Sequence, residues 1–355
     1  MKKIIPLISI LFLTSCHHFQ SETNKVIQIS ADDSHISIMG RAHVNEDKSV
    51  LFGFPGVSFF LETQGKQLTA DIQSNNGNSW IDVIVDDQPA KVMKISNLPK
   101  TIALFSFEIS GTHKVRLTHR SENWHGQVTL KQFNLVGEKF LPAPKLPKRK
   151  LMILGDSVTC GEAIDRVAGE QKQTSWWNAR ESYGLLTAHA VNAQVNLVCW
   201  GGRGLIRSWN GKTDEQNLPD FYEYAAGDSD AHLKWDHTQY QPDIIVSAIG
   251  TNDFSSGIPD HETYVTTYVK FIQKLRDSHP QAEILLIEGS ILNGENKSVL
   301  VDYLAETVKR VNDPKVHQGK SSYHSGDASD AHPTKEQHAL MAKELTKQIK
   351  QLMDW

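Results

Sequence analysis

Three residues at two widely separated places in the chain have the types needed for nucleophilic catalysis. Ser157 ends the sequence Gly-Asp-Ser, and His332 ends the sequence Asp-Ala-His that begins at Asp330. A serine hydroxyl is a weak nucleophile unless a base removes its proton, and a third group must orient that base. We therefore predict Ser157 as the nucleophile, His332 as the general base and Asp330 as the residue that orients His332.

Both motifs occur a second time, in the sequence GDSDAH at 227–232. Ser157 follows directly on the apolar run 151–154, whereas no such run precedes the second copy. His332 comes just before Thr-Lys-Glu-Gln at 334–337, a pattern typical of a helix start. A helix at this place would hold the backbone of His332 in a fixed position. We therefore predict that 227–232 is a polar loop without a catalytic role.

Hydrogen-bond donors for the negative charge that develops in an acyl transfer are also present. The glycine-rich stretch 201–204 follows a second apolar run, and glycines let backbone N–H groups approach a ligand. Asn252 follows a third apolar run, which places its side-chain amide near the same edge. Each of these residues also has a purely structural interpretation, as a turn or pre-helix residue, and that alternative weighs most for Asp330.

The first half of the chain has the pattern of an all-β domain. Residues 26–137 contain short stretches in which apolar side chains alternate with others, as at 103–109 and 81–85, separated by frequent turns. This pattern predicts a β-sandwich of jelly-roll size. The segment 138–149, rich in Pro and Lys, predicts a stiff and solvated linker.

The second half, 150–355, alternates buried-strand runs with helical patterns, which predicts a three-layer α/β/α domain around a parallel sheet. In such a domain the ligand site lies at the carboxyl ends of the strands. The expected strands are 151–154, 195–200, 243–249 and 283–287, and the expected helices are 181–193, 262–278, 299–311 and 334–353.

Four short blocks of the second half resemble, in their order, those of the SGNH (GDSL-type) hydrolases. The blocks are GDSVTCG at 155–161, GGRG at 201–204, GTNDFS at 250–255 and DAHPT at 330–334. The resemblance implies a flavodoxin-like domain. It also implies an oxyanion hole formed by the backbone N–H groups of Ser157 and Gly202 and by the side chain of Asn252. The chain departs from the family at Trp200-Gly201, where a small polar residue often precedes the oxyanion glycine.

A narrower resemblance follows from the domain order. A jelly-roll domain before the SGNH domain, the Cys of GDSVTC and the Phe-Ser of GTNDFS are similar to carbohydrate esterase family 2. Members of that family are secreted bacterial acetyl esterases of plant polysaccharides such as xylan and glucomannan, often acting at the sugar 6-position. The resemblance implies an acetyl esterase of carbohydrate that works through an acetyl-enzyme.

Three other functions compete with this one. The same fold with another substrate gives a lipase or thioesterase, which would prefer long acyl chains. A surface lipoprotein that binds glycans without turnover would use the β domain instead of Ser157. An esterase of acetylated cell-wall glycan is the third.

Composition excludes several classes of partner and cofactor. A net charge of −4 over 355 residues leaves no basic surface of the kind that nucleic acids require. The 16 His include neither H-E-x-x-H nor a paired Cys/His spacing, so we expect neither a metal nor another cofactor.

The N-terminus has the pattern of an export signal. Two lysines precede the apolar run 4–13, which is too short for a stable membrane span. The sequence Leu-Thr-Ser-Cys ending at Cys16 resembles the lipobox of bacterial lipoproteins, which implies acylation of that thiol. We expect a lipoprotein signal peptide at 1–15, a tether at 16–25 and an exported lipoprotein of the outer membrane, facing the periplasm or the cell surface. An ordinary signal peptide with an incidental Cys is the alternative.

The Cys and Trp residues give two further predictions, each with an alternative. Cys160 and Cys199 both follow predicted strands, and an exported chain can oxidise them, but two buried free thiols is the slightly preferred expectation. Five Trp lie between the first and third predicted strands of the second half, and aromatic faces suit sugar rings. We expect at least one to stack on substrate, with Trp209 and Trp235 the leading candidates and core packing the alternative.

Overall fold

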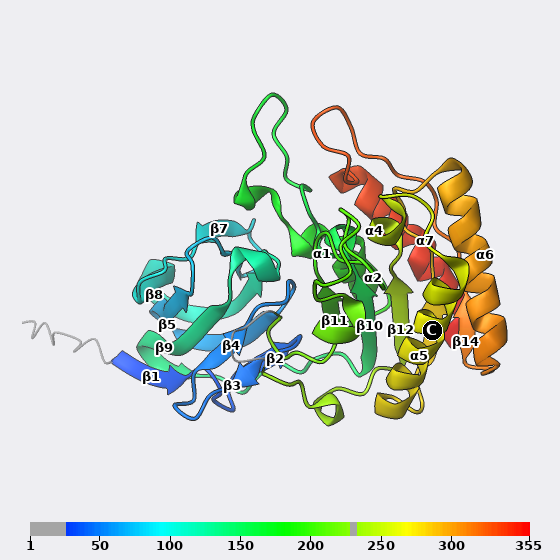
Figure 1. Cartoon of the computed structure of the whole chain (residues 1–355). Helices are drawn as coiled ribbons and strands as arrows, with labels where there is room; N and C mark the ends of the chain where they lie inside the picture. Colours follow the sequence, from blue (N-terminus) through cyan, green and yellow to red (C-terminus); the bar gives the residue numbers. More distant parts are fainter. Residues whose placement is uncertain (1–25, 228–232) are drawn as a thin grey trace, which may run out of the picture.

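The computed structural model describes residues 26–227 and 233–355. Figure 1 shows a β domain, coloured blue to teal, beside an α/β domain coloured green to red. The expected signal peptide, the tether with Cys16 and residues 228–232 of the second GDSDAH motif lie outside the described residues.

The β domain confirms the predicted all-β fold. Its strands form one antiparallel sheet in the order β3-β4-β9-β5-β8-β6-β7, with β1 paired to β9 and β2 to β5. Buried and partly exposed residues alternate along most of the long central strand β5, as expected for a half-buried strand. The strands are β1 Val26–Ser30, β2 Ser37–Met39, β3 His43–Val44, β4 Val50–Phe52, β5 Ser58–Ser74, β6 Trp80–Val85, β7 Lys91–Lys94, β8 Lys100–His119 and β9 Val128–Phe140.

The last strand of this domain extends past its predicted end. Residues up to Phe140 belong to β9, where Phe140 is buried and pairs with Thr63 of β5. The Pro- and Lys-rich composition from which the linker 138–149 is predicted does not mark where the strand ends, and Glu138 and Lys139 are exposed residues of β9. In the structure they are the outward-facing part of the strand, and the linker spans 141–148.

The α/β domain has a five-stranded parallel sheet in the described part of the chain, in the order β11-β10-β12-β13-β14. This is the flavodoxin-like order, as predicted. The last strand was missed because it is short and only Val316 in it is apolar and buried. The strands are β10 Arg149–Gly155, β11 Ala193–Cys199, β12 Ile244–Ala248, β13 Glu283–Leu286 and β14 Val316–Gln318.

Helices cover both faces of this sheet. One apolar cluster joins α2 and α7 to side chains such as Leu151 and Ile153 of β10, and a second joins α5 and α6 to the opposite face through Met152 and Leu154. The helices are α1 Ser157–Cys160, α2 Tyr183–Ala190, α3 Leu218–Phe221, α4 Thr251–Phe254, α5 His261–Ser278, α6 Gly294–Val311 and α7 Lys335–Met353. Short 3-10 turns lie at Asn123–His125, Thr174–Trp176, Ala179–Glu181 and His237–Gln239. Among the described helices, none has the length and apolar character needed to cross a bilayer.

A disulfide joins Cys160 to Cys199, so the expectation of two free thiols is wrong. The sheet register pairs Gly155 with Cys199, and the short helix α1 turns back from β10 so that Cys160 lies over the end of β11. The sequence showed that both residues follow strands but not that those strands are neighbours.

Replacing both cysteines with alanine is expected to destabilise the α/β domain by about 4 kcal/mol, because the bridge closes a loop across a sequence separation of 39 residues. The urea midpoint of the Cys160→Ala/Cys199→Ala variant measures this loss. Wild-type protein in reducing buffer should show a similar shift, and an unchanged midpoint in both would contradict the prediction.

Polar and cationic groups fix the two domains against each other. Arg41 of the β domain is fully buried, and its Nη1 donates to the carbonyl oxygens of Tyr222 (2.5 Å) and Tyr224 (3.1 Å) in the α/β domain. Burial lowers the pKa of Arg41 to about 10, and its guanidinium lies 5.4 Å from the ring centre of Trp235. The interface therefore has the buried character of a domain core.

Candidate active site

Three neighbouring strand ends bring the predicted site residues together. The register pairs Gly155 of β10 with Cys199 of β11 on one side and with Ala248 of β12 on the other. Ser157 therefore lies between the segments that carry Gly202 and Asn252. This is the carboxyl edge of the sheet, where parallel α/β folds place their ligands.

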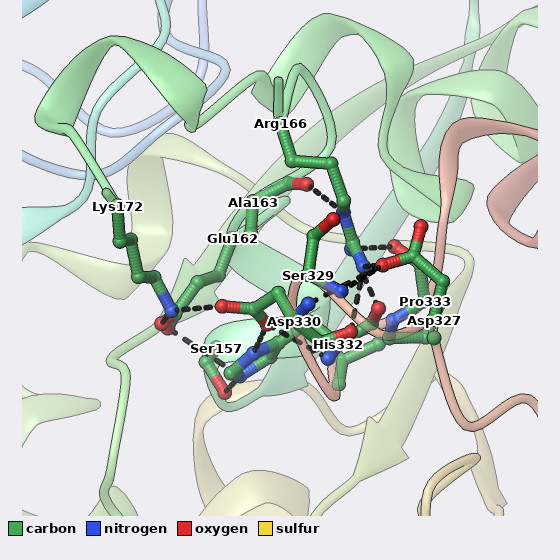
Figure 2. A network of polar contacts seen from close by, with 12 residues as sticks. Ser157, Glu162, Ala163, Arg166, Lys172, Asp327, Ser329, Asp330, His332 and Pro333 are labelled. Carbon is green, nitrogen blue, oxygen red and sulfur yellow. Dashed lines mark hydrogen bonds and ion pairs between the residues drawn. The ribbon is translucent and has the colours of Figure 1, made fainter. Parts of the chain in front are cut away.

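Ser157, His332 and Asp330 form a continuous hydrogen-bonded chain (Figure 2). His332 Nε2 lies 2.9 Å from Ser157 Oγ, and His332 Nδ1 lies 2.6 Å from Asp330 Oδ1. Because Nδ1 faces a carboxylate it carries the ring proton, which leaves Nε2 free to accept the serine proton. The arrangement is that of a nucleophile, a general base and an orienting acid.

The electrostatic surroundings support these roles. Burial acts to raise the pKa of Asp330, but hydrogen bonds from His332 and Lys172 outweigh it and hold that pKa below its usual range. Asp330 is therefore ionised throughout the neutral range. Burial acts to lower the pKa of His332, but the Asp330 hydrogen bond and the charge of Glu162 raise it above its usual value.

The loop that carries the base is held by one arginine, whose side chain is 6% exposed (Figure 2). Arg166 donates to the carbonyl oxygens of Asp330 (2.7 Å), His332 (2.6 Å) and Pro333 (2.9 Å). On the other side of the loop, helix α7 begins with the predicted capping pattern, in which the Thr334 side chain accepts the N–H of Gln337. These contacts fix the backbone on both sides of His332.

The predicted oxyanion donors Gly202 and Asn252 follow β11 and β12, the two strands that flank β10 and Ser157. Gly202 has the left-handed backbone conformation that favours glycine, with a φ of 77°. Asn252 Nδ2 donates one of its two hydrogens to the carbonyl oxygen of Arg203 at 2.8 Å, which fixes the amide and leaves its other hydrogen for a ligand. Ser157 begins α1, and the first N–H groups of a helix lack intrahelical acceptors.

Replacing Asn252 with alanine is expected to lower kcat about 10²- to 10³-fold with little change in KM, since the amide acts mainly on the oxyanion of the transition state. Steady-state kinetics on an acetate ester measures this loss. Asn45→Ala, which removes an amide of the β domain that donates to Ser49, is the matched control and should retain full activity. If kcat of Asn252→Ala fell by less than tenfold, Asn252 would not be an oxyanion donor.

Family models match both domains. The Carbohydrate esterase 2 N-terminal model matches residues 38–144, and the GDSL-like Lipase/Acylhydrolase family matches residues 153–340. The chain is also 59% identical over 358 residues to an "Acetylxylan esterase / glucomannan deacetylase" of Cellvibrio japonicus, with all of both chains covered.

The chain belongs to carbohydrate esterase family 2. It is therefore a carboxylic ester hydrolase with an SGNH catalytic domain, as the four sequence blocks predicted.

Solved structures of the same family agree with this esterase over nearly its whole length. A family two carbohydrate esterase from Cellvibrio japonicus has a TM-score of 0.92 at 61% identity, covering 93% of this chain and 99% of that one. A family two carbohydrate esterase from Clostridium thermocellum in complex with cellohexaose has a TM-score of 0.85 at 30% identity, covering 90% and 99%.

The β domain of the esterase reaches into the catalytic centre, which the sequence did not indicate. Glu122 is fully buried, and its carboxylate accepts the backbone N–H of Gly201 and, at 2.6 Å, the Nε1–H of Trp177. Burial and the charge of Glu162 raise the pKa of Glu122 to about 8. A Cβ at position 201 would lie 2.7 Å from a Glu122 oxygen, so this contact explains why a glycine precedes Gly202.

The two leading Trp candidates have different surroundings. Trp209 is 62% exposed, and its ring lies against Gly202, where a Cβ would come within 2.9 Å of Trp209 Cδ1. Its position beside the oxyanion glycine is compatible with stacking on a substrate. Trp235 is buried under Arg41 in the domain interface, so its selection as a sugar-stacking residue is wrong.

Several residues near the base are not indicated as site residues in the sequence analysis. Glu162 and Lys172 lie beside His332 and Asp330, and Trp124 of the β domain is half exposed and packs edge-on against Trp177. Glu162 follows the GDSVTCG block directly, which was a signal for it. Nothing in the sequence indicates Lys172 or Trp124, because the long loop and the domain contact that place them leave no periodic pattern.

Proposed function

We propose that this esterase removes O-acetyl groups from plant polysaccharides of the xylan and glucomannan type, through an acetyl-enzyme on Ser157. The observation that carries the proposal is the hydrogen-bonded chain from Ser157 through His332 to Asp330 at the strand ends. The relatives' names supply the substrate class.

The reaction begins when Ser157 Oγ attacks the acetyl carbonyl carbon and His332 Nε2 takes the hydroxyl proton. The negative charge moves to the carbonyl oxygen, where the N–H groups of Ser157 and Gly202 and the amide of Asn252 stabilise it. The C–O bond to the sugar then breaks, and the imidazolium gives its proton to the departing sugar oxygen.

Water completes the cycle by the same steps in reverse. His332, neutral again, takes a proton from a water molecule as that water attacks the acetyl carbon. The second tetrahedral intermediate collapses, the proton passes from His332 to Ser157 Oγ, and the product leaves as acetic acid, which ionises to acetate in water. Asp330 keeps the imidazole oriented and stabilises its charged form in both halves.

The exposed Trp209 ring beside the oxyanion glycine favours a carbohydrate over a lipid acyl chain, because sugar rings lie flat on aromatic faces. Hydrolysis of 4-nitrophenyl acetate, butyrate and octanoate tests this point. The proposal predicts a strong preference for acetate. A preference for octanoate would support the lipase alternative instead.

We also propose that the protein is an exported lipoprotein of the outer membrane, anchored by acylation of Cys16. This proposal depends on the sequence pattern that ends at Cys16. Metabolic labelling of expressing cells with a fatty-acid analogue should mark the wild-type protein but not a Cys16→Ser variant. Equal labelling, or none in either, would refute the anchor.

A further inference from the structure

A carboxylate that the mechanism above does not use lies beside the catalytic base. Glu162 Oε2 is 3.5 Å from His332 Nε2, the same nitrogen that lies 2.9 Å from Ser157 Oγ. The Glu162 side chain is only 12% exposed. Because Nε2 acquires the proton during both halves of the reaction, a carboxylate at this distance acts on the charge that develops there.

An ammonium group links this carboxylate to the orienting acid (Figure 2). Lys172 Nζ contacts Glu162 Oε1 and lies 2.8 Å from Asp330 Oδ2. The opposite oxygens of the two carboxylates face the imidazole, Asp330 at Nδ1 and Glu162 at Nε2. Lys172 also lies 5.1 Å from the ring centre of Trp177, which gives its ammonium group a fixed aromatic support.

Glu162, Asp330, Lys172 and His332 together have no net charge only when His332 is protonated. With a neutral imidazole, the two carboxylates and the one ammonium of Lys172 leave a net negative charge. When His332 takes the serine proton, the group becomes neutral. The surroundings of His332 are therefore organised to favour the imidazolium that exists in the transition states, and one of the two negative charges is compensated in advance by Lys172.

We propose that Glu162 is a second carboxylate serving His332, which stabilises the imidazolium from the Nε2 side, and that Lys172 holds Glu162 and Asp330 in place while offsetting one negative charge. Both are positioning residues that act through His332. The inference rests on the proposed esterase reaction, in which His332 is the base.

Other charged and titratable groups also face this ring. Asp156 is buried at the start of α1, His338 is buried in α7, and Arg166 binds the carbonyl oxygen of His332. The charge of Glu162 raises the pKa of Asp156 and of Glu122, so both carboxyls ionise more readily in Glu162→Gln and offset part of its effect on His332. The direction of the shift is kept, because Glu162 is the carboxylate beside Nε2 and, with Asp330, supplies the charge that raises the pKa of His332.

The two residues act on His332 with opposite signs. The negative charge of Glu162 raises the pKa of His332, and the positive charge of Lys172 lowers it. Since the free enzyme needs a neutral base, kcat/KM rises with pH as His332 loses its proton. Removing Glu162's charge should move this acid limb to lower pH, and removing that of Lys172 should move it to higher pH.

The test is the pH dependence of kcat/KM for 4-nitrophenyl acetate in Glu162→Gln and Lys172→Met. The expected shifts are opposite in direction, and the plateau for Glu162→Gln should fall by about fivefold, the size of one partly exposed charge interaction. In the double variant the acid limb should return toward the wild-type position. A purely structural contribution would lower activity in both variants without opposite shifts.

Glu306→Gln and Lys309→Met are matched controls, because this pair on α6 is 3.6 Å apart and makes the same changes in net charge away from the site. Neither should move the acid limb. Thermal melts check that each variant folds. If Lys172→Met does not fold, the inference is tested by Glu162→Gln alone, whose acid limb of kcat/KM should move to lower pH. Shifts in the same direction, or no shift, would overturn the inference.

A second measurement separates this inference from the esterase proposal. Histidine-selective NMR of the enzyme without substrate, assigned with a His332→Asn variant, follows the titration of His332 directly. If wild type fails to hydrolyse acetate esters, the esterase proposal fails while the NMR shifts still test the effect of Glu162 and Lys172 on the ring. Active wild type with unshifted NMR titrations would refute the inference alone.

Discussion

Replacing Ser157 with alanine is expected to lower kcat/KM for acetate esters by about 10⁴-fold or more, because it removes the atom that forms the acyl bond. Ser157 Oγ lies 2.9 Å from His332 Nε2 at the tip of β10, next to the segments that carry the predicted oxyanion donors Gly202 and Asn252. The variant should fold normally, since alanine suits the first turn of α1 and the Asp156 cap to Val158 N–H remains. Stopped-time assays with 4-nitrophenyl acetate and thermal melts measure both expectations.

The matched control is Ser329→Ala. Ser329 lies on the loop that carries the base, but it binds Asp327 through its backbone N–H, which alanine retains. This variant should keep near wild-type activity. Substantial turnover by Ser157→Ala, or an equal loss in the two variants, would refute Ser157 as the nucleophile.

Replacing His332 with alanine is expected to cost a comparable factor in kcat/KM on sugar acetates, because Ser157 then lacks a base and the sugar oxygen lacks a proton donor. With an activated ester, whose leaving group needs no proton, acetyl-Ser157 should form slowly and then accumulate, since no base activates water. Intact-protein mass spectrometry followed by peptide mapping detects the acetyl group.

His317→Ala is the control for this variant. His317 lies in β14, at the edge of the sheet, and pairs with Glu283 at 2.7 Å. It should behave as wild type and accumulate no acetyl-enzyme. An acetyl group mapped to any residue other than Ser157 in the His332→Ala variant would contradict the mechanism.

The sequence predicted the fold well where periodic patterns carry it. Strand β10 is a run of buried side chains, and α7 begins at the predicted capping pattern, so both were found close to their true bounds. The short strand β14 and the end of β9 were not, because exposed polar residues interrupt their apolar pattern. The Cys160–Cys199 bridge depends on which strands are neighbours, and periodicity does not contain that information.

The catalytic chain was predictable because each of its members follows a local structural signal. Ser157 comes directly after a buried strand and His332 directly before a capped helix, and the fold joins the two. Glu122 and Lys172 have no such signal, because a domain contact and a long loop position them. Trp235 was selected from its place in the chain alone, and only the structure shows it beneath Arg41.

The role of the β domain was open in the sequence, between a glycan-binding module and a support for the site. The structure shows that it supports the site, because Glu122 binds the N–H of Gly201, next to the predicted oxyanion donor Gly202. Asn123 Nδ2 also donates to the carbonyl oxygen of Cys199 at 3.2 Å, next to the disulfide. Both contacts hold the turn that carries Gly202.

The most direct test of the central claim is the release of acetate from acetylated glucomannan and acetylated xylan by the wild-type protein. Enzymatic quantification of free acetate, with Ser157→Ala as the blank, measures it without any artificial leaving group. We predict that wild type liberates acetate from these polymers and that Ser157→Ala liberates none above background. Binding of the polymers by wild type with no release of acetate would contradict the esterase and indicate a glycan-binding protein.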